Sequence, residues 1–370
     1  MNLTDHHLTA WGWDAGRAQA FAPHAAEGRM PGRVLTATFG AYVVGSADGE
    51  RLTTVVPSLL RAATDARDLP AVGDWVALEA ASDDEPGPGP RIAAILERRT
   101  AFVRHAPGEG VDVQVLAANV DTVFIVMALP GDFNMRRLER YLGAAWSSGA
   151  LPVVVLNKAD LCPDLEAARR RVETVAIGVS IHIVSAVDGT GLADLLPHLT
   201  AGRTVALLGS SGVGKSTLVN ALLGEERQLV RSIRKDDERG RHTTTSRELI
   251  QLPGRSLILD TPGLRSLALW DDEGIERAFA DIEALAAACR FADCAHDREP
   301  GCAVRSAIEA GELAGARLES RRKLEGELHA LDRRTTSASR AAARRSGHLR
   351  KLAADDAGTR KRGPAGAWEG

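Results

Sequence analysis

Apolar and polar positions alternate over short distances between about residues 33 and 104. Brief apolar runs are separated by glycine, proline and acidic residues, without the three-to-four-residue spacing of a long amphipathic helix. The runs cover residues 34–39, 41–44, 73–78 and 92–96. Several short strands in a segment of this size predict a small β-barrel, and the oligonucleotide-binding (OB) fold is the commonest barrel of that length.

The pattern changes at about Val113. Short apolar runs that are typical of buried parallel strands now alternate with amphipathic helical segments. We expect strands at residues 122–127, 152–156, 181–184, 205–208 and 257–259, and helices at 135–146 and 165–175. This alternation predicts a doubly wound α/β domain.

Beyond about Leu269 the chain is rich in Ala, Arg and Glu and shows no further strand pattern. From Arg333 it becomes a mixture of Ala, Ser, Arg and Gly that we expect to be disordered on its own. At 370 residues the chain is long enough for two or three domains. We predict an N-terminal extension with the barrel (1–112), an α/β domain (113–270), a helical domain (271–336) and a basic tail (337–370).

Charge is distributed unevenly along the chain. The net charge is −3, yet residues 303–370 hold 15 Lys and Arg against 9 Asp and Glu. A basic segment on an acidic body favours contact with RNA, and a solvated charged helix is the alternative. The first residues lack a signal-peptide pattern, and no apolar stretch reaches the roughly 18 residues that span a bilayer. We therefore expect a cytoplasmic protein without membrane contact.

A glycine-rich loop follows the fourth predicted α/β strand and precedes a helical pattern. It comprises Gly209, Ser210, Ser211, Gly212, Val213, Gly214, Lys215 and Ser216, with Thr217 next. Glycines let successive backbone N–H groups face phosphate oxygens at a helix N-terminus. We expect Lys215 to reach the β and γ phosphates in binding and catalysis, and the Ser216 hydroxyl to bind Mg²⁺.

Asn157, Lys158, Ala159 and Asp160 form a base-recognition motif after the second predicted α/β strand. The Asp160 carboxylate can accept hydrogen bonds from N1–H and the exocyclic amine of guanine, whereas adenine would present it with an acceptor. Lys158 would cover the plane of the base. Together with Ser185-Ala186, the motif predicts binding of GTP rather than ATP.

The order of these motifs differs from that of an ordinary GTPase domain, which begins with the phosphate loop and ends with base recognition. Here both base-recognition elements precede the loop, and Asp260-Thr261-Pro262-Gly263 follows it. The order predicts a circularly permuted GTPase core.

Two segments after the loop carry candidate Mg²⁺ ligands and nucleotide sensors. Asp260 is placed to hold the Mg²⁺ shell, and the Gly263 N–H to meet the γ-phosphate. Either Thr243 or Thr244 would supply a further hydroxyl to the Mg²⁺ ion. The segment around Gly263 should therefore move on hydrolysis.

Leu264 occupies the position where many GTPases carry the glutamine that orients the attacking water. A leucine cannot do this, so intrinsic hydrolysis should be slow. His242 is the nearest substitute as a catalytic residue. A surface histidine in a mobile loop is the alternative.

Cys289, Cys294, His296 and Cys302 have the spacing C-x4-C-x-H-x5-C. Three thiolates and an imidazole close a tetrahedral shell, which predicts one structural Zn²⁺ without an open position for water. A redox pair or incidental cysteines are the alternatives.

Five further strings accompany the permuted motifs. They are Pro31-Gly32-Arg33-Val34, Gly73-Asp74-Trp75-Val76, Ala118-Asn119-Val120-Asp121, Arg241-His242-Thr243-Thr244-Thr245, and Phe291 to His296 with Glu299 to Cys302. With them the chain resembles, over nearly its whole length, the small-subunit ribosome biogenesis GTPases known as RsgA (YjeQ, EngC). The Arg-rich end after about Ser337 is less distinctive.

The resemblance implies an N-terminal OB-fold barrel, a permuted GTPase core and a C-terminal zinc domain. It further implies action late in maturation of the 30S subunit, with GTP hydrolysis stimulated by that subunit. We expect a monomer whose partners are the 30S subunit, 16S rRNA and GTP or GDP. Within this family His242 is the candidate catalytic histidine. Two rival functions are a nucleotide-switched rRNA-binding module with negligible hydrolysis and, less favoured by the guanine motif, a phosphate-loop enzyme acting on a small molecule.

Overall fold

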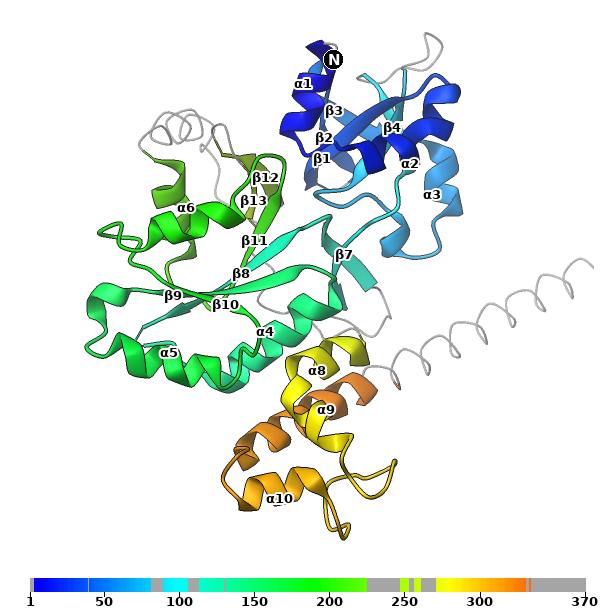
Figure 1. The fold of residues 1–370 in the computed structure, drawn as a ribbon. Helices are drawn as coiled ribbons and strands as arrows, with labels where there is room; N and C mark the ends of the chain where they lie inside the picture. The colour runs from blue at the N-terminus through cyan, green and yellow to red at the C-terminus, as the bar shows by residue number, and fades with distance from the viewer. Residues whose placement is uncertain are drawn as a thin grey trace, which may run out of the picture.

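The computed structural model describes residues 3–38, 40–80, 89–105, 113–129, 131–224, 247–252, 256–260, 271–330 and 333. Three regions follow one another along the chain (Figure 1): a β-rich region drawn in blue, an α/β region in green and a helical region in yellow and orange. Among the described helices, none has the length and apolar character needed to cross a membrane.

The N-terminal region is a closed five-stranded barrel, as predicted. Its strands are β1 (Met30–Thr38), β2 (Ala41–Ser46), β3 (Gly49–Val55), β4 (Trp75–Glu79) and β5 (Arg91–Ile95). They pair in the order β1-β2-β3-β5-β4, and β4 pairs back onto β1. Valines, leucines and isoleucines that alternate along these strands fill the interior.

Short helical elements precede the barrel strands or connect them along the chain. They are α1 (Leu3–Ala10), α2 (Ala15–Ala26), α3 (Pro57–Ala62) and the 3-10 turn η1 (Ala66–Asp68). The Asp14 carboxylate accepts a hydrogen bond from the Arg17 N–H and so begins α2. Two further strands, β6 (Ala101–His105) and β7 (Val113–Ala118), form a separate antiparallel pair after the barrel.

The central region is the predicted α/β domain. Its parallel strands lie in the order β10 (Ser180–Ile183), β9 (Leu151–Asn157), β8 (Thr122–Ala128), β11 (Thr204–Leu208) and β13 (Leu257–Asp260). The helical elements are α4 (Met135–Ser147), α5 (Leu165–Glu173), α6 (Lys215–Leu223), η2 (Ala159–Leu161) and η3 (Leu192–His198).

Strand β8 shows why a continuous apolar run predicts a central strand. All seven of its residues are buried. Val123, Ile125 and Met127 join one hydrophobic cluster, while Phe124 and Val126 join the cluster on the opposite face. A strand covered on both faces needs apolar residues at every position.

The barrel and the α/β domain share one sheet of 11 strands. Strand β12 (Arg247–Gln251) pairs antiparallel with β13 on one side. On its other side β12 pairs with β1 of the barrel, with Thr36 opposite Glu248 and Ala37 opposite Arg247. The backbone ladder therefore runs without a break from one domain into the other.

A buried arginine reinforces this barrel junction. Arg33, which is 2% exposed, donates from Nη2 to Thr204 Oγ1 at 2.8 Å and to the Asn119 carbonyl at 3.2 Å. It also donates to the carbonyl oxygens of Gly73 and Trp11. Burial lowers the pKa of Arg33 to about 9, so its guanidinium is still charged at neutral pH. The junction thus joins β1 of the barrel to β11 of the α/β domain.

The C-terminal region is helical, with α8 (Asp272–Ala278), α9 (Ala280–Ala286), α10 (Ala303–Glu309) and a helix over residues 315–330. It packs against α4 of the α/β domain (Figure 1). Asp271, the N-cap of α8, accepts a hydrogen bond from Ser147 Oγ at the end of α4. Apolar side chains of both regions belong to one continuous cluster.

Buried charged side chains also connect the two regions at this C-terminal junction. Arg317 donates from Nη1 to Glu139 Oε1 on α4 at 3.0 Å, and from Nε to Asp281 Oδ2 on α9 at 2.6 Å. The Arg317 and Glu139 side chains are 5% and 4% exposed. At the rim, Arg136 pairs with Glu319 and Arg140 with Glu327.

Candidate functional site

The phosphate loop lies between β11 and α6, as its sequence context predicts. Strand β11 ends at Leu208 and α6 begins at Lys215. Gly214 has a φ of 93°, and a Cβ at this position would collide with the side-chain amide of Asn157. Glycine is required here both for the backbone conformation and for this close approach.

Two cationic side chains contact the second residue of the loop, Ser210. Lys215 Nζ donates to the carbonyl oxygens of Ser210 at 2.6 Å and Gly209 at 2.7 Å. Arg137 Nη1, from the first turn of α4, donates to Ser210 Oγ at 2.7 Å. Further along, the side chains of Ser211, Ser216 and Thr217 are exposed, so their hydroxyls are accessible to a ligand.

The base-recognition motif lies beside the loop, at the carboxyl end of β9. Asn157, which is 1% exposed, donates from Nδ2 to the Val213 carbonyl at 2.9 Å and accepts at Oδ1 from the Ala186 N–H at 3.1 Å. Lys158 adopts a left-handed φ of 63°, and its Nζ donates to the Gly212 carbonyl at 2.8 Å. Asn157 thus links three segments that are far apart in the sequence.

The segment that contains Ser185 and Ala186 holds Asp160 in place. Ser185 Oγ donates to Asp160 Oδ1 at 2.7 Å, and the Ala159 N–H donates to the Val184 carbonyl. One carboxylate oxygen is therefore occupied, and the side chain remains exposed. The structure brings together Asn157 to Asp160, Ser185-Ala186 and the phosphate loop, as the motifs require.

Other predicted site residues lie at the border of the described chain. Asp260 ends β13, which pairs in parallel with β11, so its backbone lies beside the strand that leads into the phosphate loop. Five predicted residues lie outside the described residues: His242, Thr243, Thr244, Gly263 and Leu264. Their roles stay predictions.

The cysteine and histidine cluster of the C-terminal region is assembled. The ligand atoms of Cys289, Cys294, His296 and Cys302 all lie within 4.8 Å of one another. His296 Nδ1 lies 3.7 Å from Cys289 Sγ and 3.5 Å from Cys302 Sγ, and these two sulfurs are 3.9 Å apart. Tetrahedral ligands around Zn²⁺ are about 3.5–3.8 Å apart, so this donor set could hold a zinc ion.

Side chains around the cluster fix the loop that carries it. Glu299 accepts hydrogen bonds from the backbone N–H groups of Ala295, Asp297 and Arg298. Arg322 donates to the His296 carbonyl at 2.9 Å. His296 itself has a φ of 59°, a conformation that non-glycine residues adopt rarely. These contacts orient the ligands from outside the cluster.

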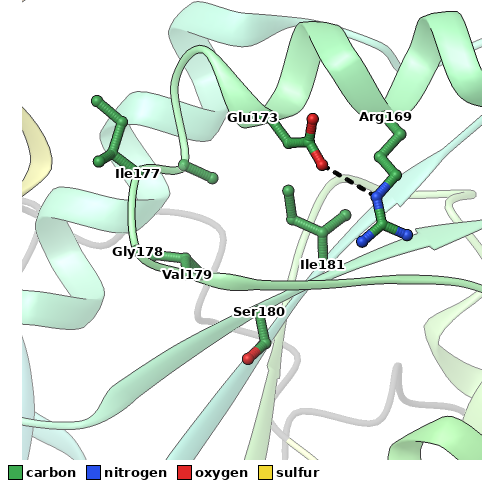
Figure 2. Close-up of a pocket in the computed structure, with 8 residues that line it drawn as sticks. Arg169, Glu173, Ile177, Gly178, Val179, Ser180 and Ile181 are labelled. Carbon is green, nitrogen blue, oxygen red and sulfur yellow. Dashed lines mark hydrogen bonds and ion pairs between the residues drawn. The ribbon is translucent and has the colours of Figure 1, made fainter.

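A separate hollow of about 360 Å³ lies between the end of α5 and the edge strand β10 (Figure 2). Ile177, Val179 and Ile181 line it, and the Arg169–Glu173 ion pair closes one side. None of the predicted nucleotide or metal residues lines this hollow. It does not belong to the nucleotide site.

The contact between Arg137 and Ser210 is the part of the site that sequence reasoning missed. The two residues are 73 positions apart, and Arg137 belongs to a helix that also carries Arg136 and Arg140. No spacing rule distinguishes it from the two neighbouring arginines. The one available signal was the position of this helix in the chain: it follows a strand that lies next to the strand leading into the phosphate loop.

Comparison with known proteins places this geometry in a family. The family model described as RsgA GTPase matches residues 95–270. A small ribosomal subunit biogenesis GTPase RsgA from Opitutus terrae is 49% identical over 327 residues, which cover 86% of this chain and 89% of that protein. Another from Streptomyces coelicolor is 46% identical over 361 residues, covering 93% and 94%.

Solved structures agree with these relatives. The crystal structure of YjeQ from Thermotoga maritima matches with a TM-score of 0.60 and 27% identity, over 81% of this chain and 98% of that one. YloQ, described as a circularly permuted GTPase, matches with a TM-score of 0.57 and 26% identity, over 81% and 95%. The similarity therefore extends beyond the α/β core to the flanking domains.

Proposed function

Because this chain belongs to the RsgA GTPase family, we propose that it acts in late maturation of the small (30S) ribosomal subunit, as a monomer that binds GTP and 16S rRNA. It hydrolyses GTP to GDP and phosphate, the 30S subunit stimulates the reaction, and hydrolysis releases the protein. The observation that carries the nucleotide part is the convergence of Asn157, Ser185-Ala186 and the phosphate loop.

The nucleotide would lie where Asn157, Ser185-Ala186 and the phosphate loop meet. Asp160 keeps one carboxylate oxygen for the guanine edge, and Lys158 covers the base. The backbone of residues 209–217 and the Lys215 ammonium hold the phosphates, and the Gly263 N–H meets the γ-phosphate. Ser216, Asp260 and either Thr243 or Thr244 would hold Mg²⁺, which neutralises phosphate charge when bound.

Hydrolysis would depend on a substitute for the missing glutamine. Leu264 cannot orient a water molecule, so His242 takes this role and intrinsic turnover is slow. Binding to the 30S subunit would place His242 for this role and raise the rate. Substitution at both positions tests this part of the proposal.

The four-residue cluster at Cys289 to Cys302 would hold one structural Zn²⁺, since its donor set leaves no position for water. The ion would replace part of a hydrophobic core in a small helical region. Because the Asp260 segment runs directly into this region, loss of GTP would reorient it against rRNA. Cys294→Ser should then weaken the dependence of 30S binding on the nucleotide and leave GTP affinity nearly intact; equal loss of both would count against the proposal.

The decisive experiment compares GTP and ATP hydrolysis by the purified full-length protein with and without 30S subunits. We expect slow turnover of GTP alone, strong stimulation by 30S, and loss of the stimulated rate in His242→Ala. Leu264→Gln tests whether a restored amide raises the intrinsic rate. GTP binding without measurable hydrolysis under either condition would favour a nucleotide-switched rRNA-binding module instead.

A further inference from the structure

Arg137 is the one described side chain from outside the nucleotide motifs that donates a hydrogen bond to a phosphate-loop side chain. Its Nη1 lies 2.7 Å from Ser210 Oγ, and the same nitrogen forms an ion pair with Asp132. The Arg137 side chain is 38% exposed. A charged donor of this kind forms a stronger hydrogen bond than a neutral one.

Helix α4 and strand β8 fix the position of the Arg137 guanidinium. Asn134 begins α4 by accepting a hydrogen bond from the Arg137 N–H at 3.1 Å, and the Asp132 N–H donates to the Ala128 carbonyl at the end of β8. Strand β8 pairs with β11, which leads into the phosphate loop. Arg137 therefore approaches Ser210 from a helix that is anchored to the same sheet.

The C-terminal region holds the same helix from the opposite side. Glu139, two residues after Arg137, forms the buried ion pair with Arg317. Ser147 at the end of α4 donates to Asp271. The orientation of α4, and with it the position of Arg137, is thus set by contacts on both sides.

We propose that Arg137 is a positioning residue for GTP binding, which holds the phosphate loop through Ser210 and adds positive charge beside the site of the phosphates. The inference rests on the proposed binding of GTP at this loop. The Asp132 carboxylate offsets part of the Arg137 charge, and the remaining attraction of the guanidinium favours GTP, which carries more negative charge than GDP. This selectivity distinguishes it from a residue that only maintains the fold.

The chain offers a matched control one residue away. Arg136 carries the same charge on the same turn of α4, but it pairs with Glu319 on the C-terminal region at 3.2 Å. Its side chain is 60% exposed. Arg136→Ala removes the same charge from the helix without removing a phosphate-loop contact.

The experiment measures dissociation constants of the full-length protein for a slowly hydrolysed GTP analogue and for GDP, together with kcat and KM for GTP. We expect Arg137→Ala to weaken binding of the analogue about tenfold, to weaken GDP binding less, and to raise KM more than it lowers kcat. Arg137→Lys should restore part of the affinity. If the contact acts through Ser210, adding Ser210→Ala to Arg137→Ala should cause little further loss.

Three results would overturn the inference. Arg137→Ala could match Arg136→Ala in both affinities, or it could weaken the analogue and GDP equally while lowering thermal stability, which is the result of a purely structural role. Lys215→Ala serves as the test of the site itself. If Lys215→Ala kept wild-type affinity for both nucleotides, the proposed nucleotide site would be wrong, and the role of Arg137 with it.

Discussion

The α/β domain is joined to its two neighbours by different kinds of contact. At the barrel junction the backbone ladder between β1 and β12 continues the sheet, and the charged Arg33 donates to carbonyl and hydroxyl oxygens, without a carboxylate among these partners. At the C-terminal junction, paired acidic and basic side chains join α4 to the helix over residues 315–330. One junction is built mainly from backbone, the other from side chains.

This difference bears on which domain can move. A backbone ladder and a buried guanidinium require defined geometry, since any shift leaves several buried oxygens without a donor. Ion pairs between long side chains tolerate small displacements, and those at the rim are screened by salt. We therefore expect the barrel to move with the nucleotide-binding sheet and the helical region to be the adjustable partner.

Substitution of Arg33 should have the largest effect. In Arg33→Ala the Asn119 carbonyl and the Thr204 hydroxyl lose the Arg33 donor, while the Gly73 carbonyl keeps only its hydrogen bond from Asn119 Nδ2. We expect the free energy of unfolding to fall by about 4 kcal/mol. Urea denaturation with a probe in each domain would measure this. Arg33→Lys cannot reproduce the planar fork and should recover little. A loss below about 1 kcal/mol would show that Arg33 adds little to the other contacts of the junction.

Removal of the buried acid at the C-terminal junction should have the next largest effect. Glu139→Ala leaves Arg317 with Asp281 as its remaining carboxylate partner, so we expect a loss of about 2–3 kcal/mol. Limited proteolysis should show cleavage after residue 270 at lower urea than in the wild type. Loss of the barrel at the same urea concentration would contradict the independence of the two junctions.

The two junctions should also differ in their response to pH. Burial raises the pKa of Glu139, and hydrogen bonds from Ser320 and Arg317 only partly offset this. The folded protein then takes up a proton at higher pH than the unfolded chain, so its stability gains as pH falls through that interval. As the pH falls from neutral toward the ordinary pKa of a glutamate, we expect the stability of the wild type to rise relative to Glu139→Gln, which has no titrating group there.

The matched comparison at the barrel junction uses Arg33, whose lowered pKa of about 9 keeps it charged over the same interval. The stability difference between the wild type and Arg33→Ala, measured by urea denaturation at each pH, should therefore stay constant over this interval. A parallel change in both pairs of proteins would point to a titrating group elsewhere in the chain.

The rim ion pairs should contribute least. Arg136–Glu319 and Arg140–Glu327 are exposed or half-exposed, and Arg140→Ala should cost about 0.5 kcal/mol at low salt. The loss should disappear at about 1 M NaCl, where screening is nearly complete. A loss that persists in high salt would show that the aliphatic part of Arg140 stabilises the junction by packing.

Sequence patterns predicted the strands that are buried on both faces, because such strands need apolar residues throughout. Strands β3 and β12 were missed because residues such as Glu50, Arg51 and Glu248 break the apolar pattern. Pairing with neighbouring strands, rather than intrinsic preference, stabilises them. Helix α2 was missed for a similar reason, since it contains Pro23.

The site was predictable where its chemistry requires fixed spacing. The phosphate loop, the base-recognition motif and the Cys and His cluster each lie in short segments. The contacts of Arg137 with Ser210 and of Arg33 with Thr204 join residues 73 and 171 positions apart. Such pairs depend on the tertiary arrangement, which local patterns do not encode.

The shared sheet also protects the α/β domain from association with other chains. Without β1, strand β12 would be an edge with unpaired N–H and C=O groups, which can recruit another strand. The barrel covers this edge, and the opposite edge strand, β10, has only four residues. An α/β domain produced without residues 1–100 would expose the β12 edge and should be prone to aggregate, so the barrel also serves the solubility of the domain beside it.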